Sequence, residues 1–190
     1  TSAILYAVGQ KYFWQAPQAQ TPQERGLNHY QALVDREPDV PENWVNLGWH
    51  YFQTGEYEQA LENHLHALDL NPEHFGALYN AGLTYLQLSE FETAVNLLEQ
   101  AVEINPNSWE SFLVLGISQM SLEQFEEAEM SLVSALDINR HSSDTNFYMG
   151  YVLEQINDIE EAIEYYEEAL RYDPNHLLAN EGMARVTQTD

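Results

Sequence analysis

Residues 44–51 read W-V-N-L-G-W-H-Y, and the pattern of this stretch returns along the rest of the chain. The glycine within it, Gly48, recurs after every 34 residues as Gly82, Gly116 and Gly150. Two alanines follow at the same period, as Ala60, Ala94, Ala128 and Ala162, and as Ala67, Ala101, Ala135 and Ala169. A register of small residues this regular divides the chain into blocks of equal length, 41–74, 75–108, 109–142 and 143–176.

Each block predicts a pair of helices. In the first block, residues 44–54 and 57–70 place apolar side chains at helical spacing, and Gly55-Glu56 separates the two stretches. The glycine and the alanines allow two antiparallel helices to approach closely. We expect a proline to end the second helix, because the residue before a proline disfavours the α conformation. These prolines are Pro72, Pro106 and Pro174; Arg140 takes that place in the third block, where we expect a looser stop.

Trp44, Leu47, Gly48 and Tyr51, followed by the two alanines and Pro72, resemble the tetratricopeptide repeat. The resemblance covers residues 41–176. It implies an all-α fold, a right-handed α-solenoid of stacked helix-turn-helix repeats with a concave groove, which is stable only as an array. Later blocks depart locally from the pattern: Leu78, Phe112 and Asn146 replace the tryptophan, and Gln119 and Leu153 replace the tyrosine.

The resemblance also organises the flanks. Residues 41–74, 75–108, 109–142 and 143–176 are repeats one to four, residues 23–40 read as a partial repeat helix, and residues 177–190 as a C-terminal capping helix. Residues 1–22 combine an apolar segment with a linker rich in proline and glutamine. We interpret them either as a degenerate repeat or as the remnant of a membrane anchor.

The charge of the chain narrows the classes of partner. Thirty-one Asp and Glu against six Lys and Arg give a formal net charge of −25. A chain this acidic repels nucleic-acid phosphates and is not expected to bind them. Anionic membrane surfaces are disfavoured for the same reason. The chain has no cysteine, which rules out thiol catalysis, disulfides and zinc–thiolate sites.

No catalytic, cofactor-binding or metal-binding residues are predicted, so the chain is not expected to be an enzyme. It contains no nucleotide-binding loop, nucleophile elbow or His-Glu-x-x-His motif. His64 and His66 lie two residues apart on a predicted helix, and such side chains point in different directions and cannot share a metal. We interpret His64 as a core histidine. The acidic clusters around Glu126 and Glu160 read as a solvated helix face, with docking of a basic partner as the alternative.

The resemblance implies that first-helix residues line a groove that binds a partner. The groove read in this way is apolar and aromatic, which favours an apolar or amphipathic protein segment as its ligand. The carboxylate clamp known in this family uses Lys and Arg, none stands at these positions, and the only lysine is Lys11, so no such ligand is expected. We expect a third to a half of the groove side chains to pack between neighbouring helices. The predicted groove residues are Val45, Asn46, Trp49, Phe52, Tyr79, Asn80, Leu83, Leu86, Leu113, Ile117, Met120, Phe147, Tyr148 and Tyr151.

The N-terminal segment is a candidate for self-association through Ile4, Leu5, Val8, Tyr12, Phe13 and Trp14. Ile4, Val8 and Tyr12 fall on one face of a helix. The segment has three alternatives: packing onto its own array, docking head to tail in the groove of another copy, and insertion into a membrane. The sequence thus predicts an interaction scaffold or adaptor, with a self-assembling structural subunit as the alternative. The expected location leans towards a membrane-tethered or extracytoplasmic protein, with the cytoplasm left open.

Overall fold

The computed structural model describes residues 21–187. The regular secondary structure in that range is entirely α-helical. The predicted self-association segment, Ile4 to Trp14, therefore lies outside the described residues. The helices are α2 (Pro22–Arg36), α3 (Pro41–Thr54), α4 (Tyr57–Leu70), α5 (Phe75–Gln87), α6 (Phe91–Ile104), α7 (Trp109–Ser121), α8 (Phe125–Ile138), α9 (Ser143–Gln155), α10 (Ile159–Tyr172) and α11 (Leu177–Thr187). The predicted all-α solenoid is confirmed.

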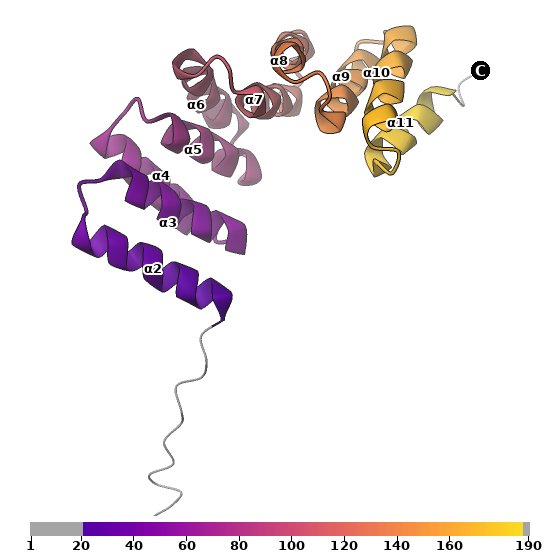
Figure 1. The fold of residues 1–190 in the computed structure, drawn as a ribbon. Coiled ribbons are helices and arrows are strands. Elements are labelled where there is room, and N and C mark those ends of the chain that lie inside the picture. Colours follow the sequence, from indigo (N-terminus) through magenta and orange to yellow (C-terminus); the bar gives the residue numbers. More distant parts are fainter. Residues whose placement is uncertain (1–20, 188–190) are drawn as a thin grey trace, which may run out of the picture.

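The helices form antiparallel pairs that stack into a curved array (Figure 1). The pairs are α3 with α4, α5 with α6, α7 with α8 and α9 with α10, with α2 before the first pair and α11 after the last. Each second helix contacts the first helix of the following pair. Successive first helices also contact one another, whereas the second helices within residues 21–187 do not. The first helices therefore line the inner side of the curve.

The recurring glycines lie where the two helices of a pair meet. A Cβ on Gly82 would stand 2.7 Å from Cγ of Leu98, and one on Gly116 would stand 2.9 Å from Cγ of Leu132. Both leucines are fully buried. Because real Cβ atoms do not approach other heavy atoms this closely, the pairs can pack at this distance only with glycine.

The loops between blocks end the second helices in one common way. Asn71, Asn105, Asn139 and Asp173 each accept a hydrogen bond on the side-chain oxygen from the backbone N–H two residues later, at 3.0–3.3 Å. Such Asx turns offer the backbone an alternative to the helix. The third loop, with Arg140 in place of proline, has the same turn, and α8 ends at the equivalent residue. The expected looser stop is absent because the Asx residue closes the helix without proline.

The turn between the two helices of each pair contains one residue in the left-handed conformation, with a positive φ. Gly55 has φ 82° and ends α3. Ser89, Glu123 and Asn157 occupy the same place in the later blocks, with φ of 63°, 59° and 66°. Only the first block fills this position with the residue that adopts it without steric cost.

The core follows the stack. Its largest buried cluster lies at the C-terminal end of the array, where α8, α9, α10 and α11 pack together around Leu132, Met149, Val152 and Tyr166. Within residues 21–187, no helix combines the length and the apolar character that crossing a bilayer requires.

Candidate functional site

The predicted groove residues lie on the first helices, on the inner side of the array, but they are not equally open. Val45 and Phe147 are buried, with 5% and 7% of their surface exposed. Val45 packs against Ala67 and Ala77, between the first two pairs. The most exposed of the predicted groove residues is Trp49, at 38%. These two are the buried members of the fourteen predicted groove residues, and the other twelve keep part of their surface exposed.

Aromatic rings line the N-terminal part of the groove. Trp49 stacks on Phe52, with ring centroids 5.2 Å apart and planes at 9°. Phe52 also contacts Tyr57, the first residue of α4, at 5.4 Å. These half-open rings form an apolar platform next to Asn46, which is itself half-buried.

The middle of the groove is partly closed by packing. Tyr79, Leu83 and Leu86 on α5 pack against the cluster that joins α6 to α7, and Leu113 packs against the C-terminal cluster. All four side chains keep part of their surface exposed, as does Asn80. This part of the inner face is lined mainly by apolar side chains that are partly exposed.

The C-terminal part of the groove contains an open apolar pocket of about 320 Å³. Five of the predicted residues line it: Ile117, Met120, Phe147, Tyr148 and Tyr151. Phe147 is its floor, since its ring contacts those of Tyr148 and Tyr151 at 5.0 and 6.4 Å and is itself buried.

Sequence reasoning missed one wall of this pocket. Leu178, 46% exposed, lines it from α11, with Ser121 as the remaining lining residue. Leu178 stands at the second place after His176, as Asp144 does after Ser142. Continuing the 34-residue register beyond the fourth block would have pointed to it.

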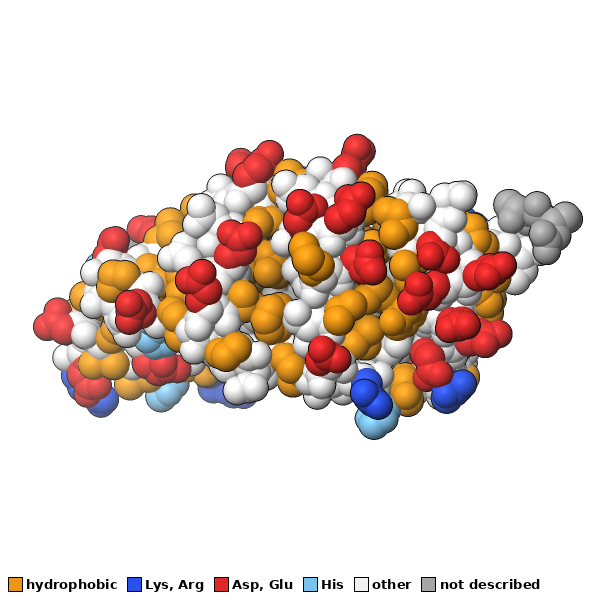
Figure 2. All heavy atoms as spheres, turned by 90° about the horizontal axis from the view of Figure 1, so that it is seen from above, with side chains coloured by type: hydrophobic (Ala, Val, Ile, Leu, Met, Phe, Trp, Pro, Cys, Tyr) orange, Lys and Arg blue, Asp and Glu red, His pale blue; other side chains and the backbone are white. Residues whose placement is uncertain are grey.

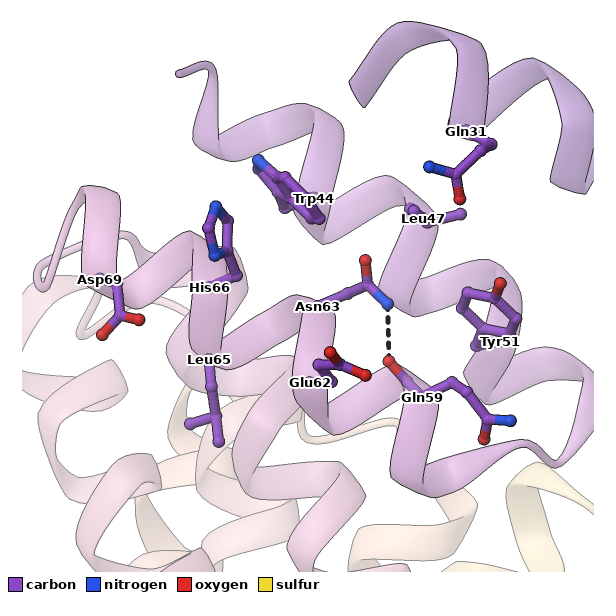
Figure 3. Close-up of a pocket in the computed structure, with 10 residues that line it drawn as sticks. All are labelled: Gln31, Trp44, Leu47, Tyr51, Gln59, Glu62, Asn63, Leu65, His66 and Asp69. Carbon is purple, nitrogen blue, oxygen red and sulfur yellow. Dashed lines mark hydrogen bonds between the residues drawn. The ribbon is translucent and has the colours of Figure 1, made fainter. Parts of the chain in front are cut away.

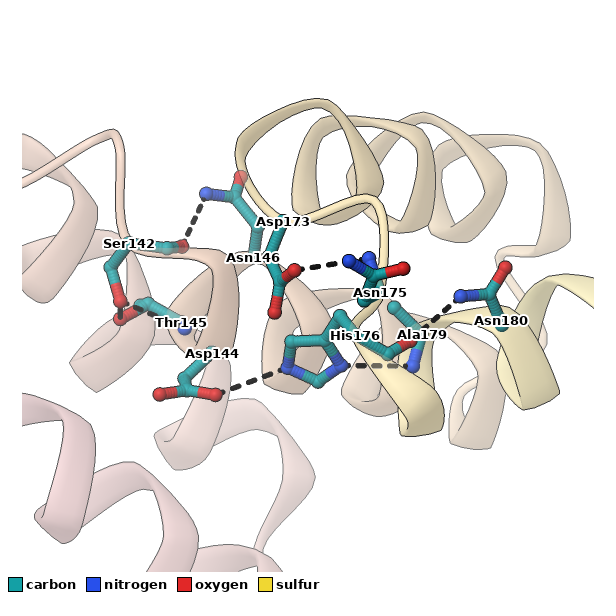
Figure 4. Close-up of polar contacts among 9 residues, drawn as sticks. All are labelled: Ser142, Asp144, Thr145, Asn146, Asp173, Asn175, His176, Ala179 and Asn180. Carbon is teal, nitrogen blue, oxygen red and sulfur yellow. Dashed lines mark hydrogen bonds and ion pairs between the residues drawn. The ribbon is translucent and has the colours of Figure 1, made fainter.

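Histidines and carboxylates connect successive blocks along the edge of the groove where the first helices begin. His74 Nδ1 accepts a hydrogen bond from the N–H of Ala77 and caps α5, while its Nε2 lies 3.0 Å from Glu42 Oε2. His176 caps α11 in the same way, and its Nε2 lies 3.1 Å from Asp144 Oδ1 (Figure 4). These two histidines cap α5 and α11 and hold them to the preceding first helices, α3 and α9.

The same edge is acidic. Glu42, Glu110 and Asp144 are exposed there, each at the second place of its block. Burial raises the pKa of Tyr79 and of Tyr148, and the neighbouring carboxylates of Glu110 and Asp144 raise them further. The groove therefore combines an apolar floor with a negative potential along one edge.

One carboxylate near the groove is neutralised internally. Glu154 accepts hydrogen bonds from Nε and Nη2 of Arg185 at 3.0 and 2.9 Å, and from the Tyr166 hydroxyl at 2.6 Å. The hydrogen bonds from Arg185 are the main cause that lowers the pKa of the Glu154 carboxyl. Burial, and then the bond to Glu154, raises the pKa of Tyr166. This cluster attaches α11 to α9 and α10.

A second recess lies outside the groove, between α2, α3 and α4 (Figure 3). It has a volume of about 490 Å³, and Trp44, Leu47 and Tyr51 contribute apolar surface to it. Two of its polar groups have local structural partners: Trp44 Nε1 donates to the carbonyl of Pro38 at 2.6 Å, and Asn63 Nδ2 donates to the carbonyl of Gln59 at 2.7 Å. We find no arrangement for acid–base chemistry among the residues that line it.

His64 is the most unusual titratable group of the described chain. It is fully buried on α4, and neither ring nitrogen has a hydrogen-bond partner. Burial lowers the pKa of His64 to about 4, so the ring is neutral near pH 7. Among residues 21–187, no three or more His, Cys, Asp or Glu side chains gather in a way that could hold a metal ion.

Comparison with known proteins identifies the repeat. Three family models, each described as tetratricopeptide repeat, match residues 39–107, 79–144 and 143–176. No curated protein sequence matches the chain significantly.

Solved structures of low sequence identity share the fold. MamA 41-end from Desulfovibrio magneticus RS-1 is 20% identical, with a TM-score of 0.75 over 93% of this chain and 97% of that one. YrrB, described as a TPR protein with an unusual peptide-binding site, is 20% identical, with a TM-score of 0.74 over 96% and 88%. The APC/C hetero-tetramer Cut9-Hcn1 gives 18% identity and a TM-score of 0.80, over 86% of this chain and 33% of that one.

Proposed function

The chain belongs to the tetratricopeptide repeat family, and we propose that it is a non-enzymatic scaffold that binds an apolar or amphipathic segment of a partner protein in its concave groove. The observation that carries the proposal is the open pocket formed by Ile117, Met120, Phe147, Tyr148, Tyr151 and Leu178. Open apolar surface rimmed by polar residues is typical of an interaction site.

The chemistry of this pocket favours a protein segment. Tyrosine and methionine provide large apolar area, and they adapt to aliphatic or aromatic side chains. Ser121 is the only lining residue with a purely polar side chain, and the hydroxyls of Tyr148 and Tyr151 are the other side-chain hydrogen-bonding groups of a lining that is otherwise apolar. YrrB, a TPR protein of the same fold with a peptide-binding site, supports a peptide or protein segment as the ligand.

A non-enzymatic role agrees with the contacts of the titratable groups near the groove. His74 and His176 cap helices, and Glu154 holds Arg185. Each makes contacts that attach one helix of the array to another, and Glu154 also accepts a hydrogen bond from the Tyr166 hydroxyl within the same cluster.

Two methionine variants test the proposal. Met120→Glu places a charge in the pocket, whereas Met130→Glu places the same charge on α8, where Met130 is 65% exposed and lines no groove position. Partners identified by affinity purification should be lost with Met120→Glu and retained with Met130→Glu, because burying a carboxylate against apolar ligand atoms is costly. Circular dichroism checks that both variants fold. Equal retention by both variants would contradict the proposal.

The second candidate is a self-assembling subunit in which residues 4–14 of one copy occupy the groove of another. The apolar character of Ile4, Val8 and Tyr12 matches that of the pocket. Because a contact of this kind is head to tail, it can propagate into chains. Packing onto the same array and insertion into a bilayer are the alternatives for this segment, and insertion would tether the protein to a membrane.

A chain lacking residues 1–20 distinguishes these alternatives, since it keeps the Thr21 capping box of α2. If residues 4–14 of one copy dock in the groove of another, light scattering over a concentration series should show that the full chain associates and that the shortened chain does not. Association of the shortened chain alone would indicate that the segment covers its own array. Flotation with vesicles that requires residues 1–20 would indicate a membrane tether.

A further inference from the structure

We propose that the segment bound in the groove carries a lysine or arginine, and that this side chain enters a recess formed by Phe75, Tyr79 and Glu110. This inference rests on the proposed function and adds to it the chemistry of the ligand. It also sets the distance between the cation of the ligand and its apolar anchor.

The recess lies where α5 and α7 begin, and it has a volume of about 370 Å³. Phe75 and Tyr79 form its aromatic wall, with ring centroids 6.3 Å apart and planes at 17°. Glu110 contributes a carboxylate from α7, and Asn105, Asn107 and Ser108 complete the lining. Ser108 Oγ donates a hydrogen bond of 3.2 Å to Glu110 Oε2, which orients the carboxylate.

Aromatic faces beside a carboxylate form a receptor for an organic cation. Ring faces attract ammonium and guanidinium groups, and a carboxylate forms charge-assisted hydrogen bonds with them. Glu110 contributes to the raised pKa of Tyr79, so its negative potential acts at the aromatic wall. None of the arginines in residues 21–187 lines the recess to neutralise it.

The charge around the recess opposes an anionic ligand. Glu42 and Asp144 stand at the equivalent place in the first and fourth blocks, so three of the four blocks place a carboxylate on this edge of the groove. With a net charge of −25, the chain attracts cationic segments over a longer range. A terminal carboxylate or a phosphorylated side chain would be repelled here.

The helix α7 sets the spacing between the two parts of the ligand. Glu110 in the recess and Ile117 in the apolar pocket lie on the same helix, seven residues apart. Seven residues make about two turns, so both side chains lie on one face and are separated by about 10 Å along the axis. A helical ligand whose axis runs along α7 therefore places its cation seven residues from its apolar anchor.

Two synthetic peptides test the inference with the full chain. Both are blocked, alanine- and glutamine-based helices with a neutral fluorescent label and a leucine–phenylalanine anchor. One has lysine seven residues from the phenylalanine, and the other has glutamine there. By fluorescence anisotropy, the lysine peptide should bind about fivefold to tenfold more tightly, since a cation–π contact and a partly exposed ion pair each contribute modestly. The difference should shrink in about 0.5 M NaCl.

Matched variants localise the effect. Glu110→Gln should remove most of the preference for lysine, and Tyr79→Leu should reduce it. Glu92→Gln should not change it, because Glu92 is the equivalent second residue of α6 and does not line the recess. A double-mutant cycle between Glu110→Gln and the glutamine peptide measures the coupling directly.

The outcomes separate the inference from the proposed function. Equal binding of both peptides that is lost with Met120→Glu overturns the cation recess and leaves the groove function standing. Binding of neither peptide overturns both. A preference for lysine that survives Glu110→Gln unchanged would also overturn the recess, because the attraction would then come from elsewhere on the acidic surface.

Discussion

The imidazole ring of His64 lies directly against Gly48, so closely that a Cβ on Gly48 would stand 2.6 Å from Cε1 and Nδ1 of the ring. In the other blocks, Leu98, Leu132 and Tyr166 occupy the corresponding place against their glycines. The apolar environment that suits those side chains leaves both nitrogens of His64 without hydrogen bonds. The first repeat therefore contains a polar ring without hydrogen bonds at the place where the second and third repeats have leucine.

Replacing His64 with leucine should raise the free energy of unfolding and make it depend less on pH in mild acid. The pKa of His64 is about 4 in the folded chain, against 6.5 for a free histidine. The unfolded chain thus binds more protons between these values, and the free energy of unfolding falls by about 3 kcal/mol as the pH drops from about 6.5 to 4. His64→Leu removes this loss. Urea denaturation at pH 7.5, 6 and 5 measures it, and parallel pH profiles for the two chains would contradict the account.

Replacing Gly82 with alanine should destabilise the array by about 1–3 kcal/mol, because the new Cβ would meet Leu98 at 2.7 Å. Gly76 on the same helix provides the control. A Cβ there would meet its nearest neighbour, in His74, at 3.5 Å, so Gly76→Ala should be neutral or stabilising through helix propensity. Thermal melts compare the two; similar melting temperatures would show that the close approach has been misjudged.

Replacing Glu123 with glycine should stabilise the turn between α7 and α8 by up to about 1 kcal/mol. A φ of 59° is sterically costly for a residue that has a Cβ atom, such as glutamate, and glycine adopts it without that cost. Asn157, with φ 66°, occupies the equivalent turn, and asparagine tolerates this conformation better. Asn157→Gly should therefore have the smaller effect in chemical denaturation. The reverse order would refute the argument.

Replacing Arg185 with methionine should loosen α11. The variant keeps an apolar stem but loses both hydrogen bonds to Glu154, at a cost of about 1 kcal/mol for this half-exposed pair. Hydrogen exchange in Leu177–Thr187 should quicken, while exchange in α3 and α4 stays unchanged. The Glu154 carboxyl should also titrate at a higher pH, since the bonds that lower its pKa are gone. Unchanged exchange would mean that packing alone holds α11.

Neutralising Glu160, Glu161, Glu164 and Glu168 to glutamine should leave peptide binding unchanged within about twofold at physiological salt. These side chains belong to α10, a second helix, and none lines the groove pocket or the recess. Charges farther than about 8 Å from a ligand are largely screened. Figure 2 shows acidic side chains spread over one face of the molecule, as expected for a solvated surface. A large loss of affinity that depends on ionic strength would favour docking of a basic partner here.

The candidate site was only partly predictable. The sequence placed Ile117, Met120, Phe147, Tyr148 and Tyr151 on first helices, and the structure brings all five to one pocket. It did not distinguish open positions from buried ones, and Val45 with 5% exposure lies in the core. Sequence reasoning also missed Leu178 in the pocket, and it did not predict that Tyr79 and Glu110 line one recess. These depend on how one block is rotated against the next.

The sequence by itself determined the helices, their pairing and their ends. Glycine and alanine at a 34-residue period allow close helix pairs, and an Asn or Asp in each loop closes the second helix through its own side chain. These are short-range effects of backbone sterics and local hydrogen bonds, so the sequence determines them, although the prediction from proline alone was wrong for the third loop, where Asn139 closes α8. The curvature of the array, the pocket shared by α7, α9 and α11, and the recess between α5 and α7 were decided only by the tertiary structure. The physical reason is that these features depend on side-chain packing between blocks. Residues more than thirty positions apart in the sequence contact one another there and determine which surfaces remain exposed.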